Sequence, residues 1–204
     1  MKAGYVIMAF LSLAIAAFQF RFLFLPIDVA SPDMVHHVAA IPFAFWLHVP
    51  SAALALGVAQ FSARLRARRP ALHRLTGRFY VAAVLAASMS GFALALNAHG
   101  GVVTQSGFAL LSLAWAGATV TAFAHARARR LDQHRQWMTR SYALAFAAVT
   151  LRLQVPILVT MLHTDYTGVL PVIAWSCWLP NLIVAEWLIW RNPRFRPSAK
   201  PDIA

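Results

Sequence analysis

Acidic residues and cysteines are scarce in this sequence. It has 6 Asp and Glu residues against 18 Lys and Arg, and it has one cysteine, Cys177, in an apolar segment beside Trp178. One cysteine cannot form a disulfide within the chain, nor can it build a cysteine-based zinc site. We therefore expect Cys177 to be a small buried apolar residue.

Charged residues make up only 12% of the sequence, whereas 60% of the residues are hydrophobic and the mean hydropathy is +0.63. These values lie far outside the usage of soluble globular domains, so the sequence predicts a protein that has the lipid bilayer as its main partner. In a soluble protein the net charge of +12 would suggest nucleic-acid binding. Here the arginines fall in short segments between apolar runs, where they report membrane orientation, and no nucleic-acid partner is expected.

Several motifs of hydrolytic enzymes are also absent. The sequence has no His-Glu-x-x-His helix, no Gly-x-Ser-x-Gly elbow and no phosphate-binding loop. Glu186 is the only acidic residue within a predicted transmembrane segment, so a mechanism that needs two carboxylates inside the membrane is excluded. The sequence leaves open whether the protein is an enzyme.

Six apolar segments are long enough to cross a hydrocarbon core of about 30 Å as helices. They predict an all-α polytopic membrane protein with a single transmembrane domain over residues 1–204. The first segment also resembles a secretory signal, but its apolar run continues past Arg21, so a retained helix is expected. The predicted helices cover residues 4–25, 38–62, 79–97, 103–125, 141–162 and 169–190.

The arginines predict the orientation of these helices. They cluster in segments 63–78 and 126–140 and in the tail, residues 191–204. The other three connections contain no Lys or Arg. By the positive-inside rule, both termini and both arginine-rich loops face the cytoplasm, and we expect the protein in a bacterial cytoplasmic (inner) membrane.

An internal repeat links the two arginine-rich segments. The pattern Arg-Ala-Arg-Arg, three residues, then His-Arg begins at Arg66 and again at Arg127, an offset of 61 residues that makes His73 and His134 equivalent. Because this offset contains two membrane crossings, the two copies share one orientation. The pattern therefore predicts a parallel repeat, in which helices 2–3 and 4–5 form a four-helix core around a pseudo-two-fold axis.

Histidines at four positions are candidate haem ligands. Two facing histidines on neighbouring helices are what a b-type haem needs. The repeat predicts that His73 lies near His134, and His48 with His99 is the pair expected on the opposite side. The alternative for each histidine alone is a residue that interacts with lipid headgroups or helix ends. A further alternative is a copper site built from outer histidines and methionines, namely Met34, His36, His37, Met161 and His163.

Polar residues within the predicted helices gather at one depth. Counting from the cytoplasmic helix ends puts Arg152 at about 18 Å, His48 at about 21 Å and Asn181 at about 15 Å. Glu186 lies at about 7 Å, too far from Arg152 for a direct ion pair unless tilt and long side chains close the gap. A central arginine costs about 2.5–3.5 kcal/mol on insertion scales. We predict a pocket around His48, Arg152 and Asn181, with Glu186 as a further candidate substrate-binding residue.

Prolines near this layer support a pocket. A proline in a transmembrane helix frees carbonyl groups that need partners in protein or water, and broken helices around polar groups commonly build binding sites. The alternative is an arginine that bonds carbonyls of a kinked helix and has only a packing role. The prolines concerned are Pro50, Pro156 and Pro180.

The sequence around the repeat resembles a known family. Residues 73–80 and 134–144, together with His48 and Arg152, are similar to a family of predicted bacterial membrane proteins classified only as a domain of unknown function. The resemblance extends from about residue 40 to residue 190 and implies no established activity.

A more distant resemblance points to the di-haem transmembrane cytochromes b of the ascorbate-dependent and ferric-reductase type. It implies haem ligands on helices 2 and 4 and on helices 3 and 5, which correspond to His48 with His99 and to His73 with His134. Three of these four histidines lie at or beyond the ends of the predicted helices, whereas in the cytochromes the ligands lie within them.

Three functions follow from these patterns. The first is a b-type haem- or quinone-associated electron-transfer protein, in which Arg152 meets a propionate or a quinone carbonyl and the partner is a quinone or a redox protein. The second is a small transporter or channel, in which Arg152 attracts an anion. The third is an assembly or accessory subunit of a larger membrane complex. The haem protein predicts visible absorbance, and the transporter predicts flux without colour. The assembly subunit predicts co-purification with a larger complex and neither of the other two properties.

Overall fold

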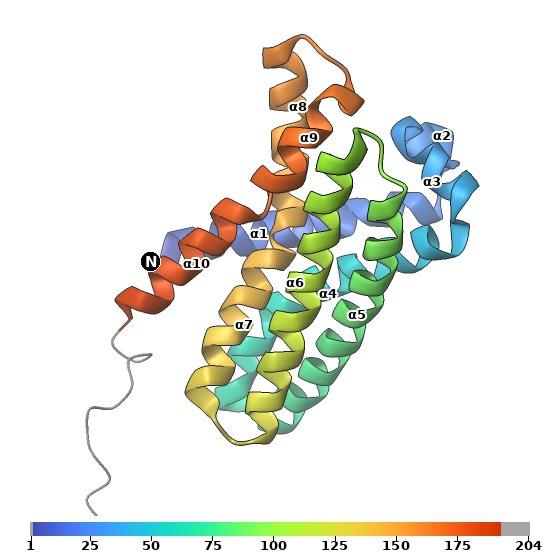
Figure 1. Cartoon of the computed structure of the whole chain (residues 1–204). Helices are drawn as coiled ribbons and strands as arrows, with labels where there is room; N and C mark the ends of the chain where they lie inside the picture. The colour runs from blue at the N-terminus through green and yellow to red at the C-terminus, as the bar shows by residue number, and fades with distance from the viewer. Residues whose placement is uncertain (1, 193–204) are drawn as a thin grey trace, which may run out of the picture.

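The computed structural model describes residues 2–192, apart from the side chains of residues 2–3, 60–64 and 67. Every regular element in this part of the chain is helical, and six stretches are long and apolar enough to cross a membrane (Figure 1). The predicted all-α fold with six membrane-spanning segments is therefore confirmed. Most of the predicted basic tail, residues 193–204, lies outside the described residues.

The spans are built from the following helices. The first is α1 (Lys2–Gln19), continued by the 3-10 turn η1 (Phe20–Leu23). Three short elements come next: α2 (Ile27–Ala30), η2 (Pro32–Met34) and α3 (Val35–Ala40). The second, third and fourth spans are α4 (Pro42–Arg68), α5 (Pro70–Leu96) and α6 (Gly101–Arg127). The fifth and sixth are each made of two helices, α7 (Leu131–Ala145) with α8 (Ala147–Leu162) and α9 (Tyr166–Ser176) with α10 (Leu179–Arg191).

The arginine-rich segments are mostly helical, which corrects the predicted loops at 63–78 and 126–140. Arg69 alone separates α4 from α5, and residues 128–130 separate α6 from α7. Pro70 begins α5 in its first turn, where its missing N–H would have no intrahelical partner anyway. His73 and His134 consequently lie inside α5 and α7 rather than at or beyond helix ends.

Helices α4, α5, α6 and α7 form a four-helix bundle of two consecutive hairpins, in which α7 also contacts α4 (Figure 1). At its centre the Tyr80 hydroxyl lies 2.7 Å from the Ser141 hydroxyl, and Ser141 also lies 2.7 Å from the Thr119 hydroxyl. Tyr80 and Ser141 are 61 residues apart, which is the offset of the sequence repeat. Positions at the spacing of the arginine pattern thus meet in the middle of the bundle, where α5 contacts α7.

The other helices surround this bundle. Helix α1 crosses it steeply and packs against α4 and α8, whereas α10 contacts α7 and then diverges from the bundle (Figure 1). The fifth span changes direction at Phe146, and the sixth at Cys177 and Trp178. Helices α4 and α8 run on through Pro50 and Pro156, so only Pro180 of the three predicted prolines lies beside a break.

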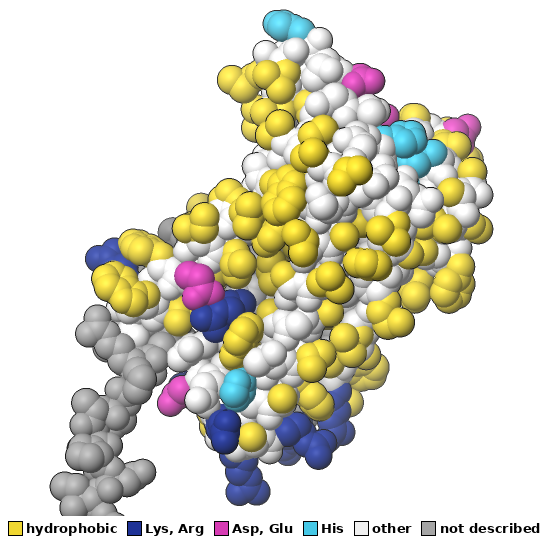
Figure 2. Space-filling view, in the orientation of Figure 1, with side chains coloured by type: hydrophobic (Ala, Val, Ile, Leu, Met, Phe, Trp, Pro, Cys, Tyr) yellow, Lys and Arg dark blue, Asp and Glu magenta, His cyan; other side chains and the backbone are white. Residues whose placement is uncertain are grey.

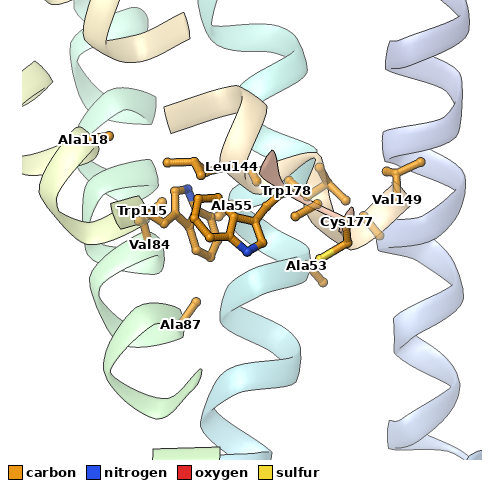
Figure 3. Packing of buried hydrophobic residues seen from close by; sticks show 14 of the residues in the cluster. Ala53, Ala55, Val84, Ala87, Trp115, Ala118, Leu144, Val149, Cys177 and Trp178 are labelled. Atoms are coloured by element: carbon orange, nitrogen blue, oxygen red, sulfur yellow. The ribbon is translucent and has the colours of Figure 1, made fainter. Parts of the chain in front are cut away.

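The core is built mainly of small side chains. Alanines at the contact surfaces let the helices approach closely, and Trp115 and Trp178 occupy the space between them (Figure 3). Cys177 belongs to this core with 0% exposure, so its predicted role as a buried apolar residue is confirmed.

The two ends of the molecule differ in charge (Figure 2). We call the end where α4 joins α5 and α6 joins α7 the basic end, because it carries Arg66, Arg68, Arg69, Arg127, Arg129 and Arg130. The far end, which we call the histidine end, carries Asp33, His36, His37, His99, His163 and Asp165.

Gly107→Ala tests the close packing of α6 against α9. A Cβ atom at Gly107 would lie 2.8 Å from the Ala174 carbonyl oxygen and 2.9 Å from the Ala174 Cβ, so the two helices would have to separate. We expect a loss of about 1–3 kcal/mol in the free energy of unfolding. Gly117→Ala, on the same helix with nothing within 4 Å of the new Cβ, is the matched control. Denaturant unfolding in detergent measures both, and equal stability of the two variants would contradict this packing.

Candidate functional site

A cavity of about 430 Å³ extends from the middle of the bundle to the histidine end. This volume lies within the range of about 300–1,000 Å³ that is common for sites that bind small molecules and cofactors. Its walls are largely apolar and come from α1, α4, α5, α6, α8 and α9. The polar side chains that line it include Gln19, Arg21, Asp33, His36, His37, His48, His99, Ser112, Arg152 and Tyr166.

His48 is fixed in one tautomer. Its Nδ1 lies 2.8 Å from the carbonyl oxygen of Ala87 on α5. Because a carbonyl oxygen only accepts hydrogen bonds, Nδ1 carries the proton and donates it, and Nε2 keeps a lone pair. This is the arrangement that commonly orients a metal-binding histidine. His48 itself lines the cavity, and its Nε2 is an acceptor nitrogen.

Gly91 makes room for the His48 ring. A Cβ atom at this position would lie 2.9 Å from His48 Cε1 and 3.0 Å from His48 Nδ1. The glycine therefore allows α5 to approach α4 closely enough for the Ala87 carbonyl to accept the hydrogen bond from His48.

Two arginines face the same cavity. Arg152 donates from Nη1 to the Ala148 carbonyl oxygen at 2.8 Å, and its charge interacts with Arg21 and with His48. Arg21 donates from Nε to the Ala30 carbonyl oxygen at 3.0 Å. Among the residues that the structure describes, neither arginine forms an ion pair with a carboxylate. The cavity therefore holds two positive charges that the described side chains do not neutralise by direct contact.

Several buried polar atoms along this cavity have no hydrogen-bond partner in the described part of the chain. Unpaired atoms of this kind are expected to cost about 1–3 kcal/mol each when they are shielded from water. Their side chains gather around the C-terminal end of α1 and the short helix α3. The unsatisfied groups therefore point to a bound ligand or to water. The atoms are Gln19 Oε1, Arg21 Nη1, His36 Nε2 and His37 Nδ1.

Three histidines stack at the mouth of the cavity. The His36 ring centroid lies 3.7 Å from that of His99 and 3.9 Å from that of His37. His99 is exposed, whereas His37 is only 9% exposed. Burial, together with the nearby His36, His99 and His48, lowers the pKa of His37 to about 4. Burial and His99 also lower the pKa of His36, so both rings are neutral near pH 7.

The residues considered for a copper site are divided, since Met34, His36 and His37 line the cavity whereas Met161 and His163 do not. Within the described residues, no three His, Cys, Asp or Glu side chains are grouped so that they hold a metal ion. His163 ends α8 in a left-handed conformation, with φ of 48°, and is not among the residues that line the cavity.

The second predicted histidine pair lies at the basic end. His134 Nδ1 is 2.8 Å from the Ala122 carbonyl oxygen, so this imidazole has the same tautomer as His48. His73 and Arg66 are close enough to His134 to interact with it electrostatically. The repeat therefore predicted the proximity of His73 and His134 correctly, although neither of the two cavities described for this structure is lined by them.

Asn181 and Glu186, which were predicted to share the site with Arg152, do not line this cavity. Asn181 donates to the Thr150 hydroxyl at 3.0 Å and to the Cys177 carbonyl oxygen at 2.9 Å. Glu186 instead accepts two hydrogen bonds from Arg140, one of 2.8 Å from Nη2. The depth count had already placed Glu186 away from Arg152, and Asn181 lies beside the break between α9 and α10, where its hydrogen bonds go to α8 and to the end of α9.

Sequence reasoning missed Gln19, Arg21, His36 and His37 as residues of this site. One signal was present, because Arg21 interrupts a long apolar run two residues after Gln19. The site depends on how α1 and α3 fold over α4, and that arrangement has no periodic pattern in the sequence.

Residues 43–189 match the family described as Predicted membrane protein (DUF2306). The chain belongs to this family. The match covers His48, Arg152 and both copies of the repeat, and it confirms the resemblance to a family of unknown function. No curated protein and no solved structure matches the chain, and nothing supports the more distant resemblance to the cytochromes b. The chain is thus an integral membrane protein of the DUF2306 family, and α1 to α3 precede the matched segment.

His37→Gln tests the burial of a neutral imidazole at the cavity mouth. Folding lowers the pKa of His37 to about 4, so the unfolded chain, with a histidine pKa of about 6.5, takes up the proton first as the pH falls. The contribution to stability is complete above about pH 6.5 and is lost towards about pH 4, by up to about 3 kcal/mol. The thermal-unfolding midpoint in detergent should therefore fall less steeply with acidification in His37→Gln than in the unsubstituted protein.

His163→Asn is the control for this measurement, because asparagine tolerates the left-handed backbone at that exposed position. It should keep the pH profile of the unsubstituted protein. Parallel profiles for His37→Gln and the unsubstituted protein would show that His37 is not buried in its neutral form.

Proposed function

We propose that this protein transfers electrons in a bacterial inner membrane and holds a b-type haem in the cavity, with His48 as an axial ligand. The observation that carries the proposal is the hydrogen bond from His48 Nδ1 to the Ala87 carbonyl oxygen at 2.8 Å. It leaves the Nε2 lone pair available at a site with largely apolar walls. A bound haem would supply reversible one-electron transfer, and the protein would supply its ligands and electrostatic environment.

The residues around His48 fit such a group. The cavity is large enough for a sizeable planar ligand, and Arg152 and Arg21 offer positive charge for the propionates. His99 lines the same cavity, as the predicted pairing with His48 requires, although its ring stacks on His36. A quinone or a redox protein is the expected electron partner.

The same proposal assigns His73 and His134 to a second haem near the basic end. Its support is the fixed tautomer of His134 and the proximity of His73. This second site has less support than the first, because the two described cavities do not include these side chains.

The proposed orientation places the basic end in the cytoplasm. The arginines that cluster between α4 and α5 and between α6 and α7 support it, since positive residues are retained on the cytoplasmic side. The cavity then lies in the outer half of the membrane, and haem at both ends would let electrons cross the bilayer.

Anion transport is the second candidate function. The observation that favours it is the presence of Arg21 and Arg152 in one cavity without a carboxylate ion pair within the described part of the chain. Charged residues at membrane depth commonly mark substrate pathways. Parallel repeats around the site would then supply two halves that move relative to one another.

A dithionite-reduced-minus-oxidised visible spectrum of the detergent-purified protein tests the haem proposal. We expect a sharp reduced haem band that loses the contribution of the cavity haem in His48→Ala, because a ligand nitrogen is removed. His73→Ala should remove only the part of the band that belongs to the second site, and His163→Asn should leave the spectrum unchanged. A colourless protein from haem-replete cells would overturn the haem proposal and give anion transport the first place.

Gly91→Ala tests the same site without removing a ligand. The new Cβ would overlap the position of the His48 ring and force it to shift. A cost of about 1–3 kcal/mol corresponds to a roughly 5- to 150-fold loss of haem affinity in a titration of the apoprotein. Gly77→Ala, on the same helix with nothing within 4 Å of its Cβ, should bind haem as the unsubstituted protein does. Equal affinities of the two variants would contradict the role given to His48.

A further inference from the structure

We propose that Arg21 and Arg152 bind one carboxylate group together, so that the cavity takes an acidic amphiphile with its carboxylate held beside Gln19 and His37. The proposal rests on the proposed function, because both take the same cavity as the binding site. It adds Arg21 as a binding residue and names the ligand as a monoanionic carboxylate, of which a haem propionate is one example and a long-chain fatty acid another.

Arg21 is held in place before any ligand arrives. Its guanidinium carbon lies 3.7 Å from the centre of the Phe18 ring and 4.7 Å from that of Phe22. Its Nε donates to the Ala30 carbonyl oxygen at 3.0 Å. These contacts fix the plane of the guanidinium group, yet Nη1 is buried without a hydrogen-bond partner. A positioned arginine with an unused donor is suited to a carboxylate, because the planar fork matches two carboxylate oxygens.

Arg152 supplies the second positive charge. It comes from α8, and the charges of Arg152 and Arg21 act on each other. Its hydrogen bond within the described part of the chain uses Nη1, so the remaining donors of the guanidinium group are available to a ligand. Two like charges that face one cavity repel each other, and an anion between them removes this repulsion.

The charge balance of the cavity favours a single negative charge. Asp33 is the only acidic residue among those that line it, against the two arginines. Tyr166 also lines the cavity and interacts electrostatically with Arg152 and Asp33. His36 and His37 contribute no charge near pH 7, because burial lowers the pKa of both. One added carboxylate therefore brings these groups to neutrality, whereas a phosphate group, with about −1.5 to −2 charges, would leave an excess.

The neighbouring atoms complete the polar end of the site. Gln19 and His37 are each 9% exposed, and Gln19 Oε1 and His37 Nδ1 are buried and unpaired. His37 Nδ1, as the N–H of a neutral imidazole, is able to donate to a carboxylate oxygen, and Gln19 Oε1 is able to accept from a water molecule bound to that carboxylate. Beyond them the walls are apolar, with Phe45, Leu56 and Phe108 among the lining residues. A cavity with one polar end and apolar walls is complementary to an amphiphile, which has a polar head group and an apolar body.

Binding of matched acids and esters in detergent tests the proposal. The probes are hemin and its dimethyl ester, and oleate and methyl oleate, each measured by quenching of tryptophan fluorescence, since Trp115 lines the cavity. We expect the unsubstituted protein to bind each acid about tenfold or more tightly than its ester. Arg21→Gln and Arg152→Gln should each lose this preference while keeping their affinity for the esters, which also shows that they are folded.

Two further variants sharpen the result. Arg21→Lys keeps the charge without the planar fork and should retain part of the preference. Arg74→Gln removes an exposed arginine at the basic end and should change nothing. If hemin fails to bind while oleate binds with the expected preference, the haem proposal fails and the carboxylate site stands. Equal affinities for acids and esters, an unchanged preference in Arg21→Gln, or no binding of any probe would overturn the carboxylate site.

Discussion

In the hydrocarbon of a membrane, a polar group is satisfied by the protein or by nothing, and this constraint governs most of the described structure. Hydroxyl groups of the spans repeatedly donate to the carbonyl four residues earlier, as Ser12, Ser90 and Thr119 do. Side chains also bind the carbonyl groups beside the breaks in the fifth and sixth spans. Thr150 donates to the Phe146 carbonyl oxygen, and Asn181 donates to the Cys177 carbonyl oxygen. The cavity stands out because its polar groups are left unsatisfied.

The contrast between these regions explains how the bundle carries a site. Small side chains let α4, α5, α6 and α7 pack tightly, and hydroxyl pairs such as Tyr80 with Ser141 lock the centre. Helices α1 and α8 add Ala16, Ala147 and Val149 to the same core. Further towards the histidine end, side chains of these helices and of the bundle line the cavity, with His48 from α4 and Arg152 from α8.

Much of the fold was predictable because hydropathy and charge act along the chain. The six spans, the arginines at one end and the meeting of His73 with His134 all follow from patterns that repeat at fixed spacing. The helix ends were less predictable, since arginine side chains tolerate a helix that extends beyond the hydrocarbon. For the cavity, counting depth along the helices put His48 and Arg152 in one layer, and both line it, whereas Asn181 from the same layer does not. Gln19, Arg21, His36 and His37 were missed because only tertiary packing brings them to the cavity.

The contact between Tyr80 and Ser141 bears on the sequence repeat. Tyr80 is 2% exposed and Ser141 is 0% exposed, so a phenol and a small hydroxyl share one closed space. The two positions are 61 residues apart, which is the spacing of the arginine pattern, yet their side chains differ greatly in size. A single chain is able to carry different side chains at two such positions, whereas an assembly of two identical hairpins is not. One half of the bundle is therefore free to line a cavity without the other half doing so.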